Sequence, residues 1–404
     1  MVSAIYFSVL SIIFIKVRIN VKWEQRKGKS IFYSKSNKDF PELTVLSATQ
    51  DKGMIPRSST GIDIKYEKKS LRGYKKIEPG DFVVHLRSFQ GGFAYSDLTG
   101  IVSPAYTVFT FKQPEMFNNY FWKEKFTSYN FIQLLKKVTY GVRDGRSISY
   151  SDFLTLNEKF PVKVEQTKIA DLFKIIDNLI TLQQRKLEQF KQLKKALLQQ
   201  LFVDKNNKQP NLRFKNFNGD WEQHKLDEML QERNEQITVN DKYPLMSFVQ
   251  GAGVVPKSQR YNREFLVKSS NKKYKKTELG DFIYSSNNLE TGSIGFNKTG
   301  KAVISSVYSI FKSRNNRESQ FIGILSKQKK FINKMLRYRQ GVVYGQWKIH
   351  ESDFLNLRIL APNIQEQEKI IDLFSKIDTL ITLQQNKLTQ LTTLKKYLLQ
   401  KLFI

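Results

Sequence analysis

Residues 165–202 read EQTKIADLFKIIDNLITLQQRKLEQFKQLKKALLQQLF, and residues 366–403 read EQEKIIDLFSKIDTLITLQQNKLTQLTTLKKYLLQKLF. The two stretches align without a gap, each position shifted by 201, and about two thirds of the positions are identical. Internal repeats fix the architecture of a chain. The repeat therefore predicts one structural design that occurs twice, with an internal two-fold and a long helix at the end of each copy.

Weaker matches extend the repeat upstream of the helices. Trp23-Glu24-Gln25 corresponds to Trp221-Glu222-Gln223, and Gly80-Asp81-Phe82 corresponds to Gly280-Asp281-Phe282. Each half thus has a variable body followed by a nearly invariant helix. The helices are strongly alike and the bodies only weakly alike. This difference predicts a shared helical scaffold that carries two bodies with different recognition surfaces.

Both long stretches show a heptad pattern that is typical of helices packed along a seam. The helix-pairing positions are Ile169, Ile176, Gln183, Phe190 and Leu197 in the first stretch and Ile370, Ile377, Gln384, Leu391 and Leu398 in the second. Leu172, Leu179 and Leu193, with Leu373, Leu380 and Leu394, form a second row. Gln183 and Gln384 lie at the midpoints, so antiparallel pairing would place them in one polar layer that fixes the register.

The charge of the chain predicts a polyanionic partner. Sixty-seven Lys and Arg residues against 37 Asp and Glu residues give a formal net charge of +30. Solubility alone rarely needs this much charge, and like charges repel one another in a compact state. Nucleic acid is therefore favoured over a membrane surface and over incidental charge.

The sequence gives no support for a catalytic or metal site of its own. The absence of cysteine excludes disulfides and thiolate zinc sites, and the three histidines are far apart. Residues 295–301 fit the spacing of a phosphate-binding loop, but Ala302 stands where that motif needs Ser or Thr, so a turn between strands is the better interpretation. Asp81 and Asp281 are interpreted as turn residues.

We predict a mixed α/β (α+β) fold with two recognition domains related by a pseudo-two-fold and joined by two long antiparallel coiled-coil helices. Short β-branched and aromatic runs predict strands at 82–84, 106–109, 282–284 and 303–308, and residues 114–138 and 318–338 are predicted to be helical. The predicted parts are an atypical apolar segment at 1–22 outside the fold, a first body at 23–163, a central helix at 164–203, a linker at 204–220, a second body at 221–363 and a C-terminal helix at 364–404. The apolar run in residues 2–15 is too short for a typical membrane span and lacks the features of a secretion signal.

Loops at matching positions of the two basic bodies combine glycine with side chains that suit phosphates or base edges. The candidate DNA-binding residues are Lys52, Arg57, Arg87, Ser88, Gln90, Arg143 and Arg146 in the first body, and Gln250, Lys257, Arg260, Ser286, Asn287, Asn288, Arg339, Gln340 and Lys348 in the second. For any single residue, an ordinary surface loop is at least as good an interpretation.

The arrangement resembles the specificity (S) subunit of type I restriction–modification enzymes from Trp23 onward. The resemblance rests on the EQxKIxDLF starts at Glu165 and Glu366, the IDxLITLQQxKL runs at Ile176 and Ile377, the LKKxLLQxLF endings at Leu193 and Leu394, the lead-ins Phe160-Pro161 and Ala361-Pro362, and the turns at Gly80 and Gly280. The first body departs from this likeness in its shorter opening, from Trp23 to Pro41 against Trp221 to Pro244.

The resemblance implies that each body reads one half of a split site in double-stranded DNA, and that the helices set the spacing. It also implies docking of methyltransferase (M) subunits, two of them by the internal two-fold, and of restriction (R) subunits. S-adenosylmethionine, ATP and Mg²⁺ would belong to those partners, with no cofactor, metal or catalytic residue in this chain, and the complex would be cytoplasmic without contact to a membrane. The alternative hypotheses are a non-enzymatic coiled-coil scaffold with incidental charge, and the recognition half of a fused methyltransferase-nuclease.

Overall fold

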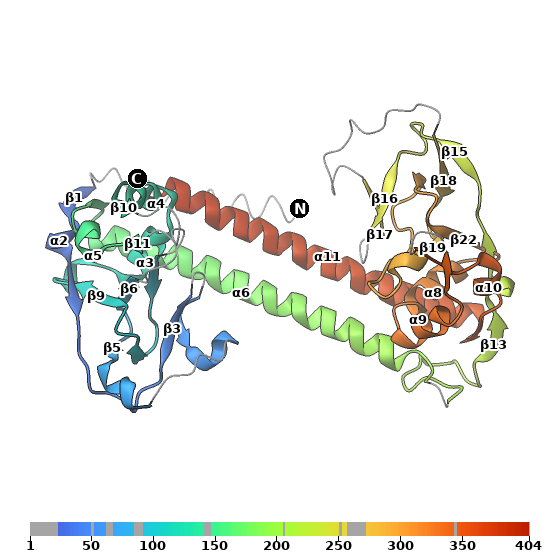
Figure 1. The fold of residues 1–404 in the computed structure, drawn as a ribbon, viewed down its shortest axis with the longest axis horizontal. Helices are drawn as coiled ribbons and strands as arrows, with labels where there is room; N and C mark the ends of the chain where they lie inside the picture. The colour runs from blue at the N-terminus through green and yellow to red at the C-terminus, as the bar shows by residue number, and fades with distance from the viewer. Residues whose placement is uncertain are drawn as a thin grey trace. The chain divides into compact units, whose positions relative to one another are not determined.

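The computed structural model describes residues 23–49, 52–61, 68–84, 92–140, 147–204, 207–249, 253–256, 272–342 and 346–403. The apolar segment 1–22 lies outside the described residues. The chain divides into two compact units: unit 1 comprises residues 1–184 and 386–404, and unit 2 comprises residues 185–385 (Figure 1). Each unit contains one body and a part of each long helix.

The body of unit 1 is built around a four-stranded antiparallel sheet with the order β2-β9-β6-β7. Its strands and those of the smaller ladders are β1 (Glu24–Lys27), β2 (Phe32–Lys35), β3 (Leu46–Thr49), β4 (Gly53–Pro56), β5 (Lys75–Ile77), β6 (Phe82–Val84), β7 (Phe93–Tyr95), β8 (Gly100–Val102), β9 (Thr107–Phe111), β10 (Thr139–Tyr140), β11 (Ser147–Ile148) and β12 (Asn157–Phe160). The helices are α2 (Gly28–Ile31), η1 (Arg57–Thr60), η2 (Lys68–Gly73), η3 (Pro114–Met116), α3 (Asn119–Thr127), α4 (Tyr129–Leu135), η4 (Lys136–Val138) and α5 (Tyr150–Phe153). Alternating aromatic side chains such as Phe82 and Phe109 point from the sheet into an aromatic core.

The body of unit 2 repeats this plan with the sheet order β14-β22-β19-β20. Its strands are β13 (Glu222–Lys225), β14 (Leu230–Glu232), β15 (Gln236–Thr238), β16 (Met246–Val249), β17 (Gly253–Pro256), β18 (Lys273–Thr277), β19 (Phe282–Tyr284), β20 (Ile294–Phe296), β21 (Ala302–Ile304), β22 (Ser309–Ser313), β23 (Gln340–Val342), β24 (Gln346–Lys348) and β25 (Arg358–Ala361). Its helices are α7 (Leu226–Met229), η7 (Ser286–Asn288), α8 (Glu318–Leu325), α9 (Lys329–Leu336) and α10 (Glu351–Leu355). The predicted mixed α and β fold is confirmed.

The longer opening of the second body forms one additional strand. In unit 2, β15 joins β18 and β21 in a three-stranded sheet, whereas β5 and β8 form only a two-stranded sheet in unit 1. The four-stranded sheet itself has the same order in both units. The difference in length therefore changes the edge of a body and leaves its central sheet intact.

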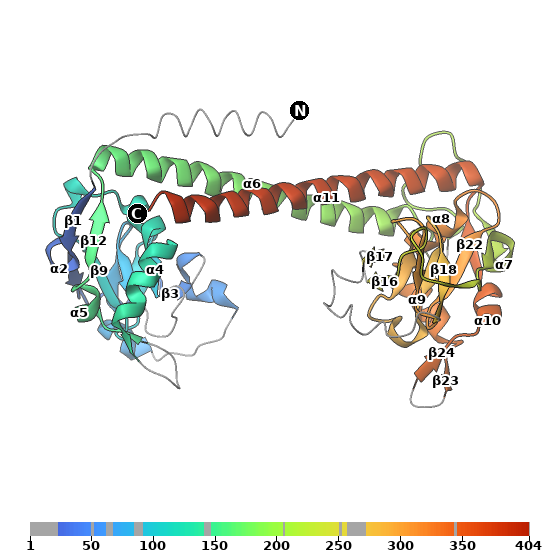
Figure 2. The ribbon, with the colours of Figure 1, turned by 90° about the horizontal axis from the view of Figure 1, so that it is seen from above.

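The two long helices, α6 (Lys163–Gln200) and α11 (Ile364–Lys401), complete the core of each unit. In unit 1, Phe173 of α6 stacks on Phe403, which follows α11, with ring centroids 5.8 Å apart. In unit 2, Phe374 of α11 contacts Phe202, which follows α6, with ring centroids 6.3 Å apart. Figure 2 shows the last turns of α6 and the first turns of α11 in this unit. All four rings are buried, so each body packs against the start of one helix and the end of the other.

Reciprocal ion pairs join the helices within each unit. Lys395 contacts Asp177 at 2.7 Å in unit 1, and Lys194 contacts Asp378 in unit 2. The pairs are equivalent under the shift of 201 residues. In both units a later residue of one helix meets an earlier residue of the other, so the helix segments run antiparallel in each unit.

The predicted helix-pairing positions are on the inner side of their helices. Ile169, Ile176, Ile370, Ile377, Leu391 and Leu398 are buried, and Phe190 and Leu197 are half-buried. The second row of leucines is partly wrong, because Leu193 and Leu380 are exposed by 46% and 38%. Gln183 and Gln384 each have a buried side-chain oxygen without a hydrogen-bond partner, and their sharing of one layer stays a prediction.

Some local predictions hold and one is wrong. The loop at 295–301 is a turn between β20 and β21, and helices fill most of 114–138 and 318–338. The single strand predicted at 303–308 is in fact the end of β21, a turn, and the approach to β22. Val307 in this turn is 59% exposed, which shows that β-branched composition alone misplaced the strand.

The predicted linker at 204–220 contains a residue that is bound to the second long helix. Arg213 donates through Nε and a terminal nitrogen to both carboxylate oxygens of Glu366, at 2.9 and 2.8 Å. The equivalent carboxylate in unit 1, Glu165, accepts only from the indole of Trp23, at 3.3 Å, and its other oxygen is buried without a partner. Burial raises the pKa of the Glu165 carboxyl, which is consistent with this missing cation.

One core contact is ionic in unit 1 and apolar in unit 2. In unit 1, Lys125 of α3 forms a buried ion pair with Glu158 of β12. The corresponding residues of unit 2 are Leu325 and Ile359, which both belong to its hydrophobic core. Because desolvation offsets much of the Coulomb attraction, an apolar pair can replace a buried ion pair without loss of stability.

We therefore predict that Lys125→Leu combined with Glu158→Ile leaves the free energy of unfolding unchanged or raises it. Either substitution alone should lower it by about 3–5 kcal/mol, because one charge is then buried without its partner. Chemical denaturation of the full chain would measure this. Additive losses in the double variant would contradict the prediction.

Candidate nucleic-acid interface

The hairpin β3–β4 presents the candidate cations of the first body that the structure describes. Lys52 is exposed at its tip, and its backbone N–H donates to the Thr49 hydroxyl. Arg57 follows β4 and donates through Nε to Ser47 at 3.2 Å, with its guanidinium 5.9 Å from the Tyr74 ring centroid. The hairpin thus holds Arg57 in place by contacts within the body and leaves Lys52 directed to solvent.

The hairpin β23–β24 groups three candidates of the second body. The Arg339 guanidinium lies 4.5 Å from the Trp347 ring centroid and forms an ion pair with Glu290 at 2.9 Å. Gln340 and Lys348 are exposed, and so is nearly half of Trp347. An exposed indole beside cations is a combination that suits contact with a nucleic acid.

The short helix η7 anchors this hairpin. The Ser286 hydroxyl accepts from the backbone N–H of Ile349 at 2.9 Å, and Asn287 accepts from that of Trp347 at 2.6 Å. Ser286 is 8% exposed and its hydroxyl holds the hairpin in place, so its DNA contact stays a prediction that this burial does not favour. Asn288 is exposed and remains a candidate for base contact.

The other candidates lie outside the described residues. They are Arg87, Ser88, Gln90, Arg143 and Arg146 in the first body and Gln250, Lys257 and Arg260 in the second. The strands that lead to them are described. Residues 85–91 lie between β6 and β7, 141–146 between β10 and β11, and 250–252 between β16 and β17.

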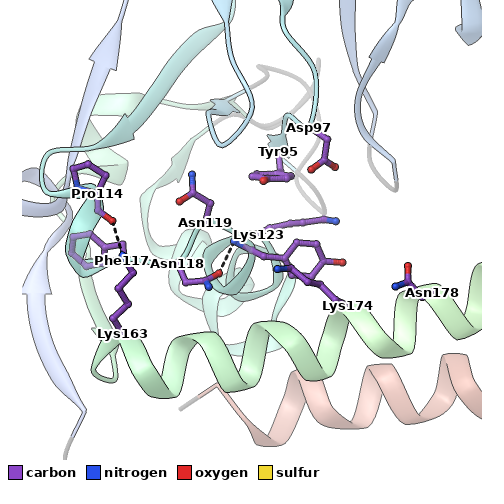
Figure 3. Close-up of a pocket in the computed structure, with 11 residues that line it drawn as sticks. Tyr95, Asp97, Pro114, Phe117, Asn118, Asn119, Lys123, Lys163, Lys174 and Asn178 are labelled. Carbon is purple, nitrogen blue, oxygen red and sulfur yellow. Dashed lines mark hydrogen bonds between the residues drawn. The ribbon is translucent and has the colours of Figure 1, made fainter.

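An open cavity of about 690 Å³ lies in unit 1 between the body and α6 (Figure 3). Its lining comes from β7 and the turn after it, from η3 and α3, and from α6: Tyr95, Asp97, Pro114, Phe117, Asn118, Asn119, Tyr120, Lys123, Lys163, Lys174 and Asn178. Figure 3 shows Lys163, Lys174 and Asn178 on α6 along one side, with Tyr95 and Asp97 across the cavity.

The cavity brings cations, amides and phenols together. Lys123 lies 4.2 Å from the ring centroid of Tyr120, whose hydroxyl donates to Asp177 at 2.7 Å. Burial, with the nearby Asp97 carboxylate, raises the pKa of Tyr95 to about 12, so this phenol is neutral at physiological pH. Such a lining can bind an anionic group, although Asp97 partly balances the lysines.

Sequence reasoning did not identify this cavity. Lys123, Lys163 and Lys174 belong to helices and not to glycine-rich loops, which was the pattern used to select candidates. Only the packing of α3 on α6 brings them together. No sequence signal would have separated them from other solvated lysines.

Within the described part of the chain, no group of three or more His, Cys, Asp or Glu side chains could hold a metal ion. The search for membrane spans, made over those same residues, finds no helix with the length and apolar character needed to cross a bilayer.

Comparison with known proteins connects this geometry with a family. Residues 218–393 match the type I restriction modification DNA specificity domain. The fold is similar to that of the type I restriction–modification S subunit from M. genitalium, with 15% identity, a TM-score of 0.60, and coverage of 95% of this chain and 97% of that one. A chain from a structure of complex assembly and conformational transition in a type I R-M system has 14% identity, a TM-score of 0.51, and coverage of 95% and 99%. No curated protein sequence matches.

Two bodies with one sheet order, each carrying basic hairpins and each completed by paired long helices, define a duplicated DNA-recognition protein. The family match lies in the second copy, and the internal repeat carries the same design into the first. The second copy therefore matches a type I restriction modification DNA specificity domain, and the whole chain has a fold similar to that of a type I restriction–modification S subunit. The resemblance inferred from the repeats is confirmed.

We predict that Trp347→Ala weakens DNA binding about two- to fivefold, because loss of a cation–π contact of about 0.5–1 kcal/mol releases the Arg339 side chain. Fluorescence anisotropy with a duplex that carries the recognised site would measure the affinity. Leu279→Ala removes another exposed side chain, on the turn before β19, and serves as the matched control. Equal affinities of the wild type and Trp347→Ala would show that the hairpin does not contact DNA.

Proposed function

We propose that each body reads one half of a bipartite DNA site and that the two long helices set the spacing between the half-sites. The duplicated frame with different reading surfaces is the observation that carries this proposal. The sheet order, the Phe173–Phe403 and Phe374–Phe202 contacts, and the interhelical ion pairs all recur. The residues beside the hairpins and the edge strand β15 differ between the two bodies.

Different reading surfaces favour different half-sites, because base readout depends on which side chains reach the groove edges. Lys52 stands at the tip of β3–β4, while Arg339 and Lys348 lie at the base of β23–β24, where Gln340 pairs with Lys348. The full site is therefore expected to be non-palindromic. Bases between the half-sites would be unread, or read only through DNA deformability.

The chain is proposed to act without its own catalytic centre, inside a cytoplasmic complex. Methyltransferase subunits would bring S-adenosylmethionine, and restriction subunits would bring ATP and Mg²⁺. Support comes from the sequence, which lacks the motifs for amino-methyl transfer and nucleotide binding. This chain would select the DNA site and set the spacing between its two halves.

An apolar face of α6 is the proposed docking surface for a methyltransferase subunit. Val164, Ile175 and Leu182 are exposed by 67%, 57% and 45%. Spacings of 11 and 7 residues place them on one side of an α-helix, at about 3.6 residues per turn. Three exposed apolar side chains in one row are unusual on a solvated helix and are typical of a binding surface.

The split-site proposal predicts the outcome of a body exchange. Replacing residues 23–163 with the first body of a related S subunit should change one half-site and leave the other unaltered. Methylome sequencing of cells that express the chain with its methyltransferase subunit would report both half-sites. A continuous palindromic motif, or a change in both halves after the exchange, would reject the two-reader proposal.

The docking proposal predicts that Ile175→Glu with Leu182→Glu prevents association with the methyltransferase subunit, because charge replaces apolar contact area. Analytical size-exclusion chromatography of the mixed subunits would detect the complex. Lys191→Glu, at an exposed position about 160° around α6 from Ile175, is the control and should leave the complex intact. Normal assembly of the double variant would place the docking surface elsewhere.

A further inference from the structure

Three lysine side chains surround a single carboxylate in unit 2, where the body meets the long helices. Asp378 of α11 accepts from Lys194 of α6 and from Lys298, which follows β20, the latter at 2.5 Å. Lys327, just after α8, is the third lysine. Burial and the nearby Lys194 and Lys298 lower the pKa of Lys327 to about 7. We call these four residues the lysine corner.

The equivalent place in unit 1 has the opposite balance of charge. There a single lysine, Lys395, contacts two carboxylates, Asp177 at 2.7 Å and Glu124 at 3.0 Å. Lys395 corresponds to Lys194 and Asp177 to Asp378 under the shift of 201 residues. One lysine with two carboxylates in unit 1 thus becomes three lysines with one carboxylate in unit 2, where the lowered pKa of Lys327 leaves its amine partly neutral near pH 7.

Three substitutions between the copies produce this difference, and one of them places Lys327 after α8 where Thr127 ends α3. The place of Glu124 in α3 is taken by Ile324 in α8, since Phe121 and Phe321 occupy equivalent core positions three residues earlier. The turn after β7 carries Asp97 where the turn after β20 carries Lys298. The corner in unit 2 therefore has an unbalanced positive charge that unit 1 does not have.

The lysine corner adjoins the hairpin β16–β17. The Thr299 hydroxyl, one residue after Lys298, donates to the backbone carbonyl of Val254 in β17. Gly253, at the start of β17, has a φ of +81°, and a Cβ there would lie 3.2 Å from the carbonyl oxygen of Phe296. The Lys298 ammonium lies 5.2 Å from the Phe296 ring centroid. The turn and the hairpin are thus fixed against each other.

We propose that Lys298 and Lys327, supported by Lys194, bind phosphate groups of the DNA backbone beside the half-site read by the second body. This inference rests on the proposed function and adds a contact that positions the duplex without reading bases. Lysine binds phosphate as a compact point charge and needs no planar partner geometry. A phosphate supplies the negative charge that the corner lacks.

A DNA phosphate fits the corner better than an acidic side chain of a docked protein. Two identical partner subunits bound at equivalent places would meet Lys298 in one unit and Asp97 in the other, so they could not share one contact. A DNA backbone needs only positive charge at the point where it passes. The attachment of the corner to a hairpin predicted to contact DNA adds to this argument.

The test is the salt dependence of DNA binding by the full chain in complex with its methyltransferase subunit. Each lost phosphate contact lowers the slope of log affinity against log salt by about 0.9, so Lys298→Ala with Lys327→Ala should lower it by roughly 1.8. Affinity should fall by the same factor on duplexes with and without the recognised site. Lys194 is retained because it also pairs the long helices.

Lys312→Ala removes one exposed lysine from β22 and is the control for a general loss of charge. If Lys312→Ala lowers the salt slope by as much per lysine as Lys298→Ala with Lys327→Ala does, the proposal is overturned. An unchanged slope in Lys298→Ala with Lys327→Ala while the wild type stays strongly salt-dependent would also overturn it, and this result would leave the proposed function intact. A flat response of the wild type itself would instead reject DNA binding.

Two further measurements keep the result interpretable. The thermal midpoint of the double variant should not fall, because removal of two crowded cations relieves repulsion and Lys194 still pairs with Asp378. If the thermal midpoint falls, the variant Lys298→Gln with Lys327→Gln is measured instead, because Gln keeps a similar side-chain volume. This variant must show the same lower salt slope. Weakened association with the methyltransferase subunit at unchanged intrinsic DNA affinity would identify a protein contact and overturn the phosphate assignment.

Discussion

The antiparallel contact between the start of one long helix and the end of the other is the constraint on which each unit depends. The core of each body includes residues that follow the long helix of the other copy. Unit 1 needs Phe403, which comes after the second helix, against Phe173, and unit 2 needs Phe202 against Phe374. Burial of such aromatic side chains is a major part of the stability of a small body. Each body therefore depends on helix pairing for part of its core.

Within that frame, the two copies show which interactions can be exchanged. The buried Lys125–Glu158 pair of unit 1 corresponds to Leu325 and Ile359 in unit 2, so an ionic and an apolar solution fit the same place. The Glu366 carboxylate is bound by Arg213, whereas Glu165 has only an indole donor. These exchanges occur where a body meets a long helix, and they leave the sheet order unchanged. The aromatic contacts at this junction are present in both units, whereas these specific pairs differ.

Function follows from the same division. In the proposed function, the constant parts of the chain set the spacing and present an apolar face on α6, and the variable parts carry the surfaces that contact DNA. Electrostatics serves both roles: Lys194 and Lys395 join the helices, while the excess of cations over the whole chain favours a polyanion. The lysine corner lies where these roles meet, since Asp378 binds one lysine from the frame and one from the body.

The sequence by itself determined the duplication, the long helices, the mixed bodies and the DNA-binding class, because repeats, heptad periodicity and net charge are properties of order and composition. It located the strands at 82–84 and 282–284 but misplaced the one at 303–308, where the exposed Val307 lies in a turn. Only the tertiary structure decided that Ser286 is buried beneath a hairpin, that Arg213 reaches Glu366, and that Lys194, Lys298 and Lys327 meet at Asp378. The hydrogen bonds among these residues join positions that are 63 to 184 residues apart. Their closeness depends on how the helices and sheets pack, which no local pattern in the chain records.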